Sequence, residues 1–232
     1  MKEVICLERS VCLLIHGFGG DSKEISYLQN YLSEKNINTC IADLPGHGKT
    51  KRELSKSSPK EWVSYLENKI NELKTSNEKI ILIGFSMGGL LCTNFLQVKE
   101  IYKIVLINTP IYFWNMKVIV RDIFSDIKKR NYEHIKYYRN SVFGTSLKSG
   151  IDFLRVLKSA KNRFKDIKMP ALVLQCKEDE SVRYKSAKYI ANQIGSQADL
   201  ILYDGGCHQI FQKALDIREK ACGDIYKFLI SK

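Results

Sequence analysis

The sequence lacks the features that would place it among secreted, membrane or metal-binding proteins. No long uncharged apolar run occurs near the N-terminus, because Glu3, Glu8 and Arg9 interrupt it, so we expect neither a signal peptide nor stable membrane insertion. The 7 cysteines are odd in number and form no C-x-x-C pair, which argues against a disulfide framework and a zinc site. With no repeats or low-complexity segments, the 232 residues predict one cytoplasmic globular domain with no bound metal.

Acidic residues are scarce relative to basic ones, which raises the question of an anionic partner. The chain has 37 Lys and Arg against 25 Asp and Glu, a net charge of +12. Between residues 111 and 168 the counts are 14 and 5, a net of +9, so most of the excess lies in one quarter of the chain. A solvated helical face explains this charge more simply than a specific anion site, and no recognition motif accompanies it. We therefore expect no nucleic-acid partner.

The stretch around which the chain is organised is IILIGFSMGG, residues 80–89. Its first four apolar residues predict a short buried strand, and a G-x-S-x-G pattern centred on Ser86 then leads into a second apolar run. Strand, Gly-flanked turn and helix are the context in which this pattern forms a nucleophile elbow. The turn exposes the serine Oγ, and the following helix directs its N-terminal N–H groups at the site. We therefore predict Ser86 as a nucleophile.

Strand and helix patterns alternate along the rest of the chain, which predicts an α/β fold with a mostly parallel central sheet covered by helices on both faces. We expect strands near residues 11–15, 38–42, 80–83, 104–107, 171–175 and 200–203, and helices near residues 24–35, 59–73, 87–98, 184–194 and 210–230. Asp21 and Glu24 have the spacing of a capping box at the first of these helices. Residues 111–167 are rich in aromatics and predict helices without strands, so we expect a small helical cap inserted into a core of residues 1–110 and 168–232.

The presence of only 4 histidines narrows the choice of a catalytic base. A serine nucleophile needs a positioned base, and that base needs an orienting acid. In this architecture the acid and then the histidine follow the serine along the chain. Among the histidines only His208 lies late enough, in the Gly-rich segment DGGCH before the last helix. We therefore predict His208 as the base.

The catalytic acid is expected just after the strand at residues 171–175, where CKEDESV offers three carboxylates. We prefer Asp179, because a short side chain followed three residues later by an apolar anchor suits a turn, and we interpret Glu178 and Glu180 as solvated neighbours. The other position at which such an acid could lie, after the strand at residues 104–107, holds Asn108 instead.

The developing oxyanion of an acyl-transfer reaction needs two preorganised N–H donors. Met87, directly after the nucleophile at the start of a helix, is expected to supply one backbone N–H. Phe18, in the loop HGFGG after an earlier strand, is expected to supply the other. Their side chains are incidental to this role.

Two other histidines lie in loops that we interpret as structural. His16 precedes Ser86 along the chain and so has the wrong order for the base. His47 and Asp43 belong to a loop near the site. The segment GHGKT at residues 46–50 is similar to the end of a phosphate-binding loop, but that motif would require glycine at position 43.

Several of these segments together resemble the α/β-hydrolase superfamily, and within it the small bacterial carboxylesterases allied to monoacylglycerol lipases. The resemblance covers nearly the whole chain and rests on HGFGG at 16–20, a loop like D-x-P-G-H-G at 43–48, GFSMGG at 84–89, NTPIY at 108–112, KMPALVLQCKEDESV at 168–182 and GGCH at 205–208. It implies the α/β-hydrolase fold and the same roles for the five site residues named above. Cys207, where relatives often have glycine or serine, and Thr50, where serine is frequent, depart from the family pattern.

This resemblance implies a serine carboxylesterase that hydrolyses short-to-medium-chain esters, with monoacylglycerols as further candidates, and that needs no metal or organic cofactor. Its partner would be a small-molecule ester, and either a monomer or a dimer is compatible with the sequence. An acyl thioesterase with the same triad is the alternative, because a basic cap suits an anionic acyl carrier. A non-enzymatic ligand-binding protein on the same fold is a weaker alternative, since the predicted triad is complete.

Overall fold

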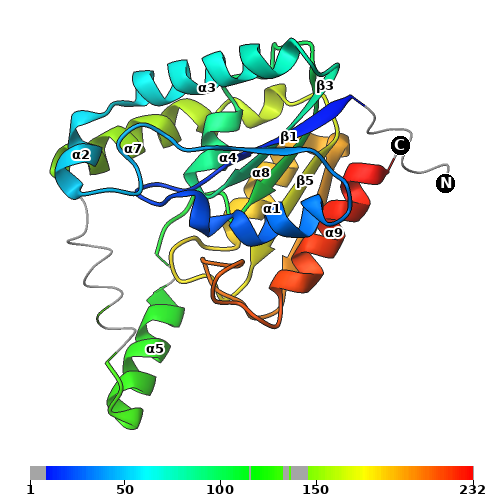
Figure 1. The fold of residues 1–232 in the computed structure, drawn as a ribbon. Coiled ribbons are helices and arrows are strands. Elements are labelled where there is room, and N and C mark those ends of the chain that lie inside the picture. Colours follow the sequence, from blue (N-terminus) through cyan, green and yellow to red (C-terminus); the bar gives the residue numbers. More distant parts are fainter. Residues whose placement is uncertain (1–8, 115, 133–135, 137–145, 232) are drawn as a thin grey trace.

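A six-stranded sheet forms the centre of the computed structural model, which describes residues 9–114, 116–132, 136 and 146–231 (Figure 1). The strand order is β2-β1-β3-β4-β5-β6, and every neighbouring pair is parallel. The strands are β1 (Ser10–Ile15), β2 (Thr39–Ala42), β3 (Lys79–Phe85), β4 (Ile101–Ile107), β5 (Ala171–Cys176) and β6 (Ala198–Tyr203). The predicted α/β architecture is thereby confirmed.

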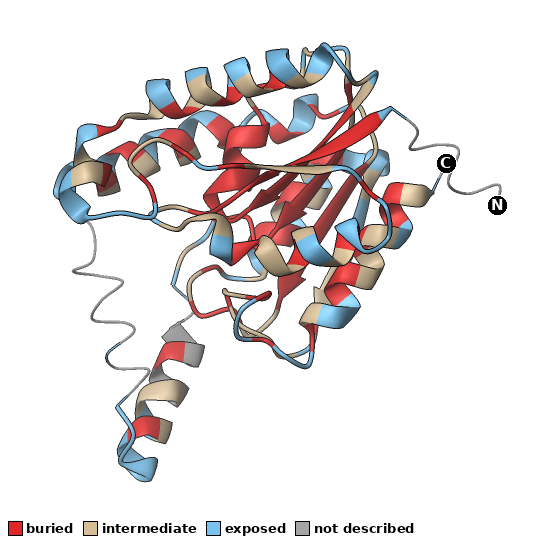
Figure 2. Ribbon diagram, viewed as in Figure 1, coloured by how far each residue is buried: buried red, intermediate tan, exposed pale blue. Residues whose placement is uncertain are grey.

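Helices cover both faces of this sheet (Figure 1). One face packs against α3 (Pro59–Lys74), α4 (Met87–Cys92), α7 (Leu147–Lys161) and α8 (Lys185–Ile194), and the other against α1 (Ser26–Ser33) and α9 (Arg218–Ile230). Along β1, Leu13 and Ile15 belong to the first core, whereas Cys12 and Leu14 belong to the second. Figure 2 shows the inner strands β1, β3, β4 and β5 almost wholly buried, whereas the edge strands β2 and β6 are partly exposed. Burial on both faces explains why the segments of the inner strands are continuous apolar runs rather than alternating ones.

Several helix ends differ from the sequence prediction. The helix after Ser86 ends at Cys92 and not at residue 98. Thr93 Oγ1 donates to the carbonyl of Leu90 at 2.8 Å and Asn94 Nδ2 to that of Leu91 at 3.0 Å, so side chains take the carbonyls that a longer helix would use. The last helix begins at Arg218 rather than at residue 210, because turns occupy the residues before it.

The region after β1 also differs from its prediction. The expected helix at residues 24–35 is divided into the 3-10 helix η2 (Ser22–Glu24) and α1. The Asp21 side chain accepts from Lys23 N–H at 2.9 Å, whereas the Glu24 carboxylate turns away into the protein interior. A short helix that the sequence analysis omitted, α2 (Lys51–Lys56), begins with a capping box formed by Thr50 and Glu53.

The segment predicted as a cap carries helices in its described part. α5 (Met116–Lys129) extends away from the body in Figure 1, and α7 and the 3-10 helix η3 (Phe164–Asp166) return to it. Residues 115, 133–135 and 137–145 of this segment lie outside the described residues. The remaining 3-10 helix is η4 (Gly195–Gln197). No helix in the described ranges combines the length and the apolar character needed to cross a membrane.

Candidate active site

The loops at the carboxyl ends of β3, β5 and β6 bring Ser86, Asp179 and His208 together. His208 Nε2 lies 3.1 Å from Ser86 Oγ, and His208 Nδ1 lies 2.8 Å from Asp179 Oδ2. Parallel strands place their carboxyl ends at one edge of the sheet, which explains how residues far apart in the chain meet there. The arrangement forms a continuous hydrogen-bonded chain from a hydroxyl through an imidazole to a carboxylate.

The backbone at Ser86 has the strained geometry of a nucleophile elbow, with φ 52° and ψ −120°. The turn is possible because two neighbouring glycines leave room for other backbone. A Cβ on Gly84 would lie 2.4 Å from the backbone nitrogen of Gly89, and a Cβ on Gly88 would lie 2.2 Å from the carbonyl oxygen of Ile15. These close approaches hold Ser86 at the point where β3 becomes α4.

The Asp179 carboxylate is fully buried and accepts four hydrogen bonds. Its Oδ1 accepts from the backbone N–H groups of Ser181 at 2.8 Å and Val182 at 2.7 Å. Its Oδ2 accepts from His208 Nδ1 and, at 3.0 Å, from Gln175 Nε2 on β5. Because the two oxygens have separate partners, the oxygen that faces the imidazole is fixed.

Two side chains that the sequence analysis did not assign to the site hold the backbone of His208. Glu180 Oε2 accepts from His208 N–H at 3.1 Å, and Glu180 is only 8% exposed, so its interpretation as a solvated neighbour was wrong. Asn108 Nδ2 donates to the His208 carbonyl at 2.9 Å, and its Oδ1 accepts from Cys176 N–H at 3.0 Å. One signal for Asn108 was present in the sequence, since a polar residue directly after a buried strand lies at the edge that carries the site.

The His208 imidazole is strongly influenced by its surroundings. Burial by itself lowers the pKa, because the charged form loses hydration. The carboxylates of Asp179, Glu180 and Glu24 act in the opposite sense and prevail, so the pKa of His208 is raised to about 9. A histidine works as a general base only when it is neutral, so activity should increase as the pH rises through this pKa.

Replacing Glu180 with glutamine should move the acid limb of the kcat/KM profile to lower pH. The amide oxygen can still accept from His208 N–H, but the negative charge that stabilises the imidazolium is lost, so the pKa of His208 falls. We expect a shift of roughly half a unit to one unit, measured with an uncharged ester across the limb.

Glu178→Gln is the matched control for this prediction, because Glu178 is a neighbouring carboxylate that is not among the charges raising the pKa of His208. Its acid limb should coincide with that of the wild type. A limb of Glu180→Gln that stays in place, or that moves to higher pH, would contradict the electrostatic account.

The two N–H groups predicted to bind an oxyanion lie beside the serine. Met87 is the first residue of α4, and Phe18 lies in the loop after β1. Within the part of the chain that the structure describes, no hydrogen bond engages either N–H. Phe18 lines the same cavity as Ser86, and a Cβ on the adjacent Gly17 would lie 3.2 Å from Ser86 Cβ, whereas Met87 directly follows Ser86 in the chain. Two N–H groups without an internal acceptor therefore belong to residues next to Ser86.

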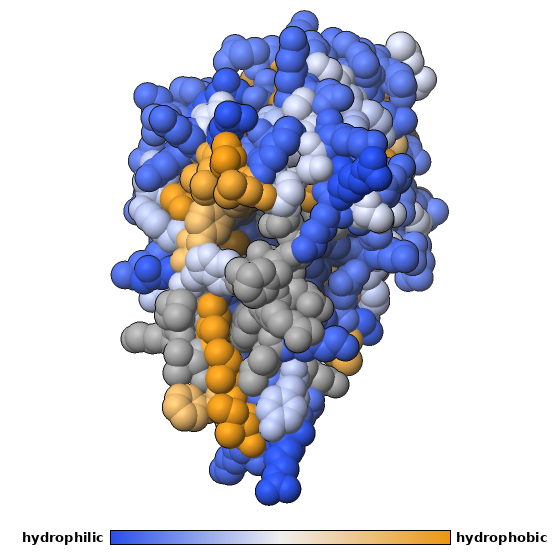
Figure 3. All heavy atoms as spheres, turned by 90° about the vertical axis from the view of Figure 1, so that its left-hand side faces the viewer, coloured by the Kyte–Doolittle hydropathy of each residue, from blue (hydrophilic) through white to orange (hydrophobic). Residues whose placement is uncertain are grey.

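A cavity of about 840 Å³ opens in front of Ser86 and His208. Aromatic side chains line one wall, with the Phe153 ring 5.1 Å from that of Phe18 and 5.3 Å from that of Phe113. Apolar residues of α7 line its outer part, and Leu147, Ile151 and Leu154 are 84%, 42% and 54% exposed. Figure 3 shows apolar side chains gathered on the face formed by α7 and α5. A carbon chain could thus contact apolar surface from the serine outward.

His16 and His47 support the loops beside this cavity. His16 Nε2 accepts from Leu44 N–H at 3.0 Å, so its Nδ1 carries the proton and donates to the Gly17 carbonyl at 2.8 Å. His47 Nδ1 donates to the Pro45 carbonyl at 3.1 Å, and burial lowers the pKa of His47 to about 4. The His16 ring therefore connects the loops after β1 and β2, whereas the His47 ring supports the second of these loops from within and stays neutral at physiological pH.

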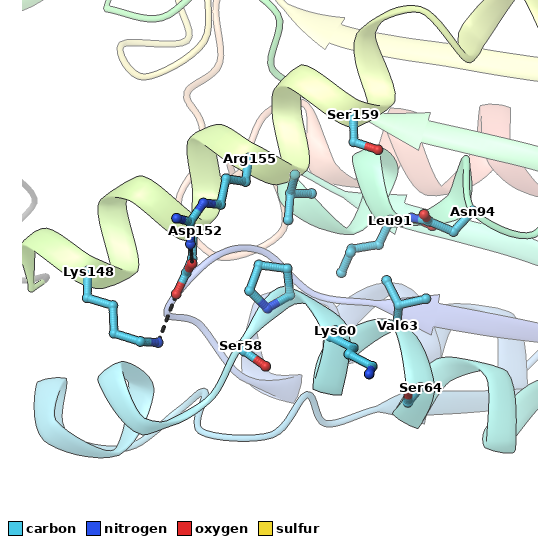
Figure 4. Close-up of a pocket in the computed structure, with 12 residues that line it drawn as sticks. Ser58, Lys60, Val63, Ser64, Leu91, Asn94, Lys148, Asp152, Arg155 and Ser159 are labelled. Carbon is cyan, nitrogen blue, oxygen red and sulfur yellow. Dashed lines mark hydrogen bonds and ion pairs between the residues drawn. The ribbon is translucent and has the colours of Figure 1, made fainter.

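A second hollow of about 600 Å³ lies between α3, α4 and α7, and its lining shares no residue with the cavity in front of Ser86 (Figure 4). Its buried carboxylate is already paired, because Asp152 accepts from Lys148 Nζ at 2.9 Å and from Arg155 Nη1 at 2.8 Å. Lys148 also donates to the Ser57 carbonyl at 2.8 Å. These bonds attach α7 to the turn before α3 and thereby support the aromatic wall of the cavity. Among the described residues, no cluster of His, Cys, Asp and Glu could hold a metal ion.

Known proteins resemble this chain in both sequence and fold. The family described as serine aminopeptidase, S33 (Hydrolase_4), matches residues 8–213. A carboxylesterase of Bacillus subtilis (strain 168) is 26% identical over 232 residues, which cover 94% of this chain and 91% of the relative. A thermostable monoacylglycerol lipase of Bacillus sp. (strain H-257) is 25% identical over 195 residues, 79% of this chain and 76% of the relative. The solved monoacylglycerol lipase of Paleococcus ferrophilus superposes with a TM-score of 0.72 at 19% identity, covering 96% and 95% of the two chains.

Proposed function

The chain belongs to the Hydrolase_4 family of α/β-hydrolases, and on that premise we propose that it is a serine carboxylesterase acting on short-to-medium-chain esters, monoacylglycerols among them. Its curated relatives are a carboxylesterase and a monoacylglycerol lipase, and this chain is likewise a carboxylic ester hydrolase. The proposal of a serine mechanism and of this substrate range is supported by the chain of hydrogen bonds from Ser86 Oγ through His208 to Asp179. Ser86 and His208 line a cavity whose walls are largely apolar.

The first half of the proposed reaction forms an acyl-enzyme. Ser86 Oγ attacks the ester carbonyl while His208 Nε2 takes its proton, and the Asp179 carboxylate stabilises the resulting imidazolium. The carbonyl oxygen becomes an oxyanion that accepts hydrogen bonds from the N–H groups of Phe18 and Met87. When the tetrahedral intermediate collapses, the C–O bond to the alcohol breaks and His208 returns its proton to the leaving oxygen.

The second half hydrolyses the acyl-enzyme. His208, neutral again, takes a proton from a water molecule whose oxygen attacks the acyl carbon. The same two N–H groups stabilise the second oxyanion, and Ser86 leaves after His208 reprotonates its Oγ. The products are a carboxylic acid and the free enzyme, and no step requires a metal or an organic cofactor.

The proposed acyl-chain preference follows from the cavity. A volume of about 840 Å³ is sufficient for an acyl group of moderate length, and its walls are aromatic and aliphatic near Ser86. Residues 111–167 would act as a cap, since α7 supplies Phe153 and Leu154 to one wall. We expect that removing apolar contacts from α7 would shorten the preferred acyl chain.

A chain-length series of p-nitrophenyl esters tests this function. We expect kcat/KM to be highest at a short or medium acyl length and to fall for long chains that exceed the cavity. Phe153→Ala should shift the maximum of kcat/KM to a shorter acyl chain. Leu215 is an exposed apolar residue outside the cavity, so Leu215→Ala should leave the maximum unchanged. A protein that hydrolyses no ester in the series would contradict the proposal.

Acyl thioesters are the second candidate substrates, and the charge near the cavity favours testing them. Lys49 and Lys51 line the cavity, where they could attract an anionic acyl carrier. For such a substrate kcat/KM should fall steeply between low and high ionic strength, because exposed charges are screened. A kcat/KM for acyl-coenzyme A that is independent of salt would count against this candidate.

A further inference from the structure

Glu24 is a buried carboxylate that the reaction described above does not use. It lies in η2, directly after the loop that carries Phe18, and only 9% of it is exposed. Its Oε2 accepts from Gly17 N–H at 2.9 Å, and its Oε1 accepts from Gln209 Nε2 at 2.8 Å. Gly17 precedes the predicted oxyanion donor, and Gln209 follows the predicted base. One side chain thus contacts both catalytic loops.

The loop after β1 is shaped to admit this carboxylate. A Cβ on Gly20 would lie 2.2 Å from the Glu24 carboxyl carbon. Any residue other than glycine at this position would therefore displace the Glu24 carboxylate. A Cβ on Gly17 would lie 3.0 Å from Glu24 Oε2. Gly17 and Gly20 therefore leave the space that the Glu24 carboxylate needs to approach the backbone of this loop.

We propose that Glu24 is a positioning residue that joins the oxyanion loop to the histidine loop. This proposal rests on the proposed function, because it assigns Glu24 to the same site. By fixing the Gly17 amide, Glu24 leaves the next amide, Phe18 N–H, free to face the cavity. By holding Gln209, it sets where the loop of His208 lies relative to that donor. Glu24 thereby contributes to the separation between the base and the oxyanion donor.

The negative charge of Glu24 does not explain its presence at the site, whereas the two hydrogen bonds that position the loops do. A carboxylate at the site disfavours a developing oxyanion, and by raising the pKa of His208 it lowers the fraction of neutral base at neutral pH. The two hydrogen bonds therefore account for Glu24 better than its charge does. If so, an uncharged side chain that keeps both bonds should keep the activity.

Glutamine is such a side chain at this position. In Glu24→Gln the amide oxygen can still accept from Gly17 N–H, and the new NH₂ group needs an acceptor on Gln209. Gln209 Oε1 is buried and has no hydrogen-bond partner among the described residues, so rotation of the Gln209 amide supplies one. Glu24→Ala removes both bonds, and Gln209→Ala removes only the connection to the histidine loop.

The experiment measures kcat, KM and the pH profile of these variants on one p-nitrophenyl ester. We expect Glu24→Ala to lower the plateau kcat about 10- to 100-fold with KM changed by less than about threefold, since the lost alignment matters mainly in the transition state. Glu24→Gln should retain a plateau kcat within about threefold of wild type and move its acid limb to lower pH. Glu34→Ala, an exposed glutamate after α1, should match the wild type.

A double-mutant cycle tests the connection between the loops. The Glu24→Ala and Gln209→Ala losses should be strongly non-additive, because each variant breaks the same bridge. Wild-type plateau kcat in Glu24→Ala, additive losses, or equal impairment of Glu24→Gln and Glu24→Ala would each overturn the proposal. Should Glu24→Ala fail to fold, judged by circular dichroism, Gln209→Ala decides: an unchanged kcat overturns the inference. A wild-type protein without esterase activity would instead refute the proposed function.

Discussion

Replacing Ser86 with alanine is expected to lower kcat for ester hydrolysis by about 10⁴- to 10⁶-fold, the largest effect of any single substitution in this chain. The variant keeps the oxyanion donors and the cavity but has no oxygen to form the acyl-enzyme. Alanine carries the same Cβ as serine and meets the same strained φ of 52°, so the fold should be unaffected. The measurement is kcat on the best ester of the chain-length series, with thermal unfolding recorded in parallel.

The matched control for this substitution is Ser64→Ala on α3, an exposed serine remote from Ser86 along the chain, which should retain wild-type kcat. A fluorophosphonate reagent should label the wild type at Ser86 and leave Ser86→Ala unlabelled. Retention of most of the activity by Ser86→Ala would show that a different residue attacks the ester.

Asp179→Asn is expected to lower kcat by about 10⁴-fold, the second-largest effect. Two backbone N–H groups donate to Oδ1, at 2.8 and 2.7 Å, so the asparagine oxygen takes that position and its NH₂ group faces His208. The imidazole must then accept at Nδ1 and carry its proton on Nε2. In that tautomer it cannot take the proton of Ser86 Oγ, which lies 3.1 Å away.

Two observations separate this tautomer effect from a loss of folding. KM of Asp179→Asn should remain near the wild-type value and its far-UV circular dichroism spectrum should match the wild type, because Asn fits the same volume. Glu178→Asn, one residue earlier in the same loop, should keep wild-type kcat. If Asp179→Asn retains more than about a tenth of the wild-type kcat, Asp179 does not orient the base.

Side chains from several loops hold the backbone of His208 and the residue that follows it. Asn108 and Glu180 hold its backbone carbonyl and N–H, and Glu24 holds the side chain of the next residue. Each of these groups lies on a different loop. The position of the imidazole is therefore determined jointly by the loops after β1, β4, β5 and β6.

Local patterns predicted much of the fold and the residues placed at the centre of the site. The apolar runs indicated the six strands, most clearly the four inner ones, because a strand buried on both faces needs continuous apolar residues. The strand–turn–helix geometry at Ser86 could be predicted because such an elbow requires glycines at fixed spacing. Helix ends were predicted less well: Thr93 and Asn94 end α4 through side-chain bonds to its carbonyls, which an apolar pattern does not indicate.

The sequence by itself determined the alternation of strands and helices, the elbow, and the order of serine, acid and histidine, since each depends on residues that are close in the chain or on chain order. Only the tertiary structure decided that Glu180 is buried against the His208 backbone and that Glu24 joins two loops. Glu24 and Gln209 are 185 residues apart, and no local pattern relates them. Their meeting depends on the packing of parallel strands, which brings the loops at one edge of the sheet together.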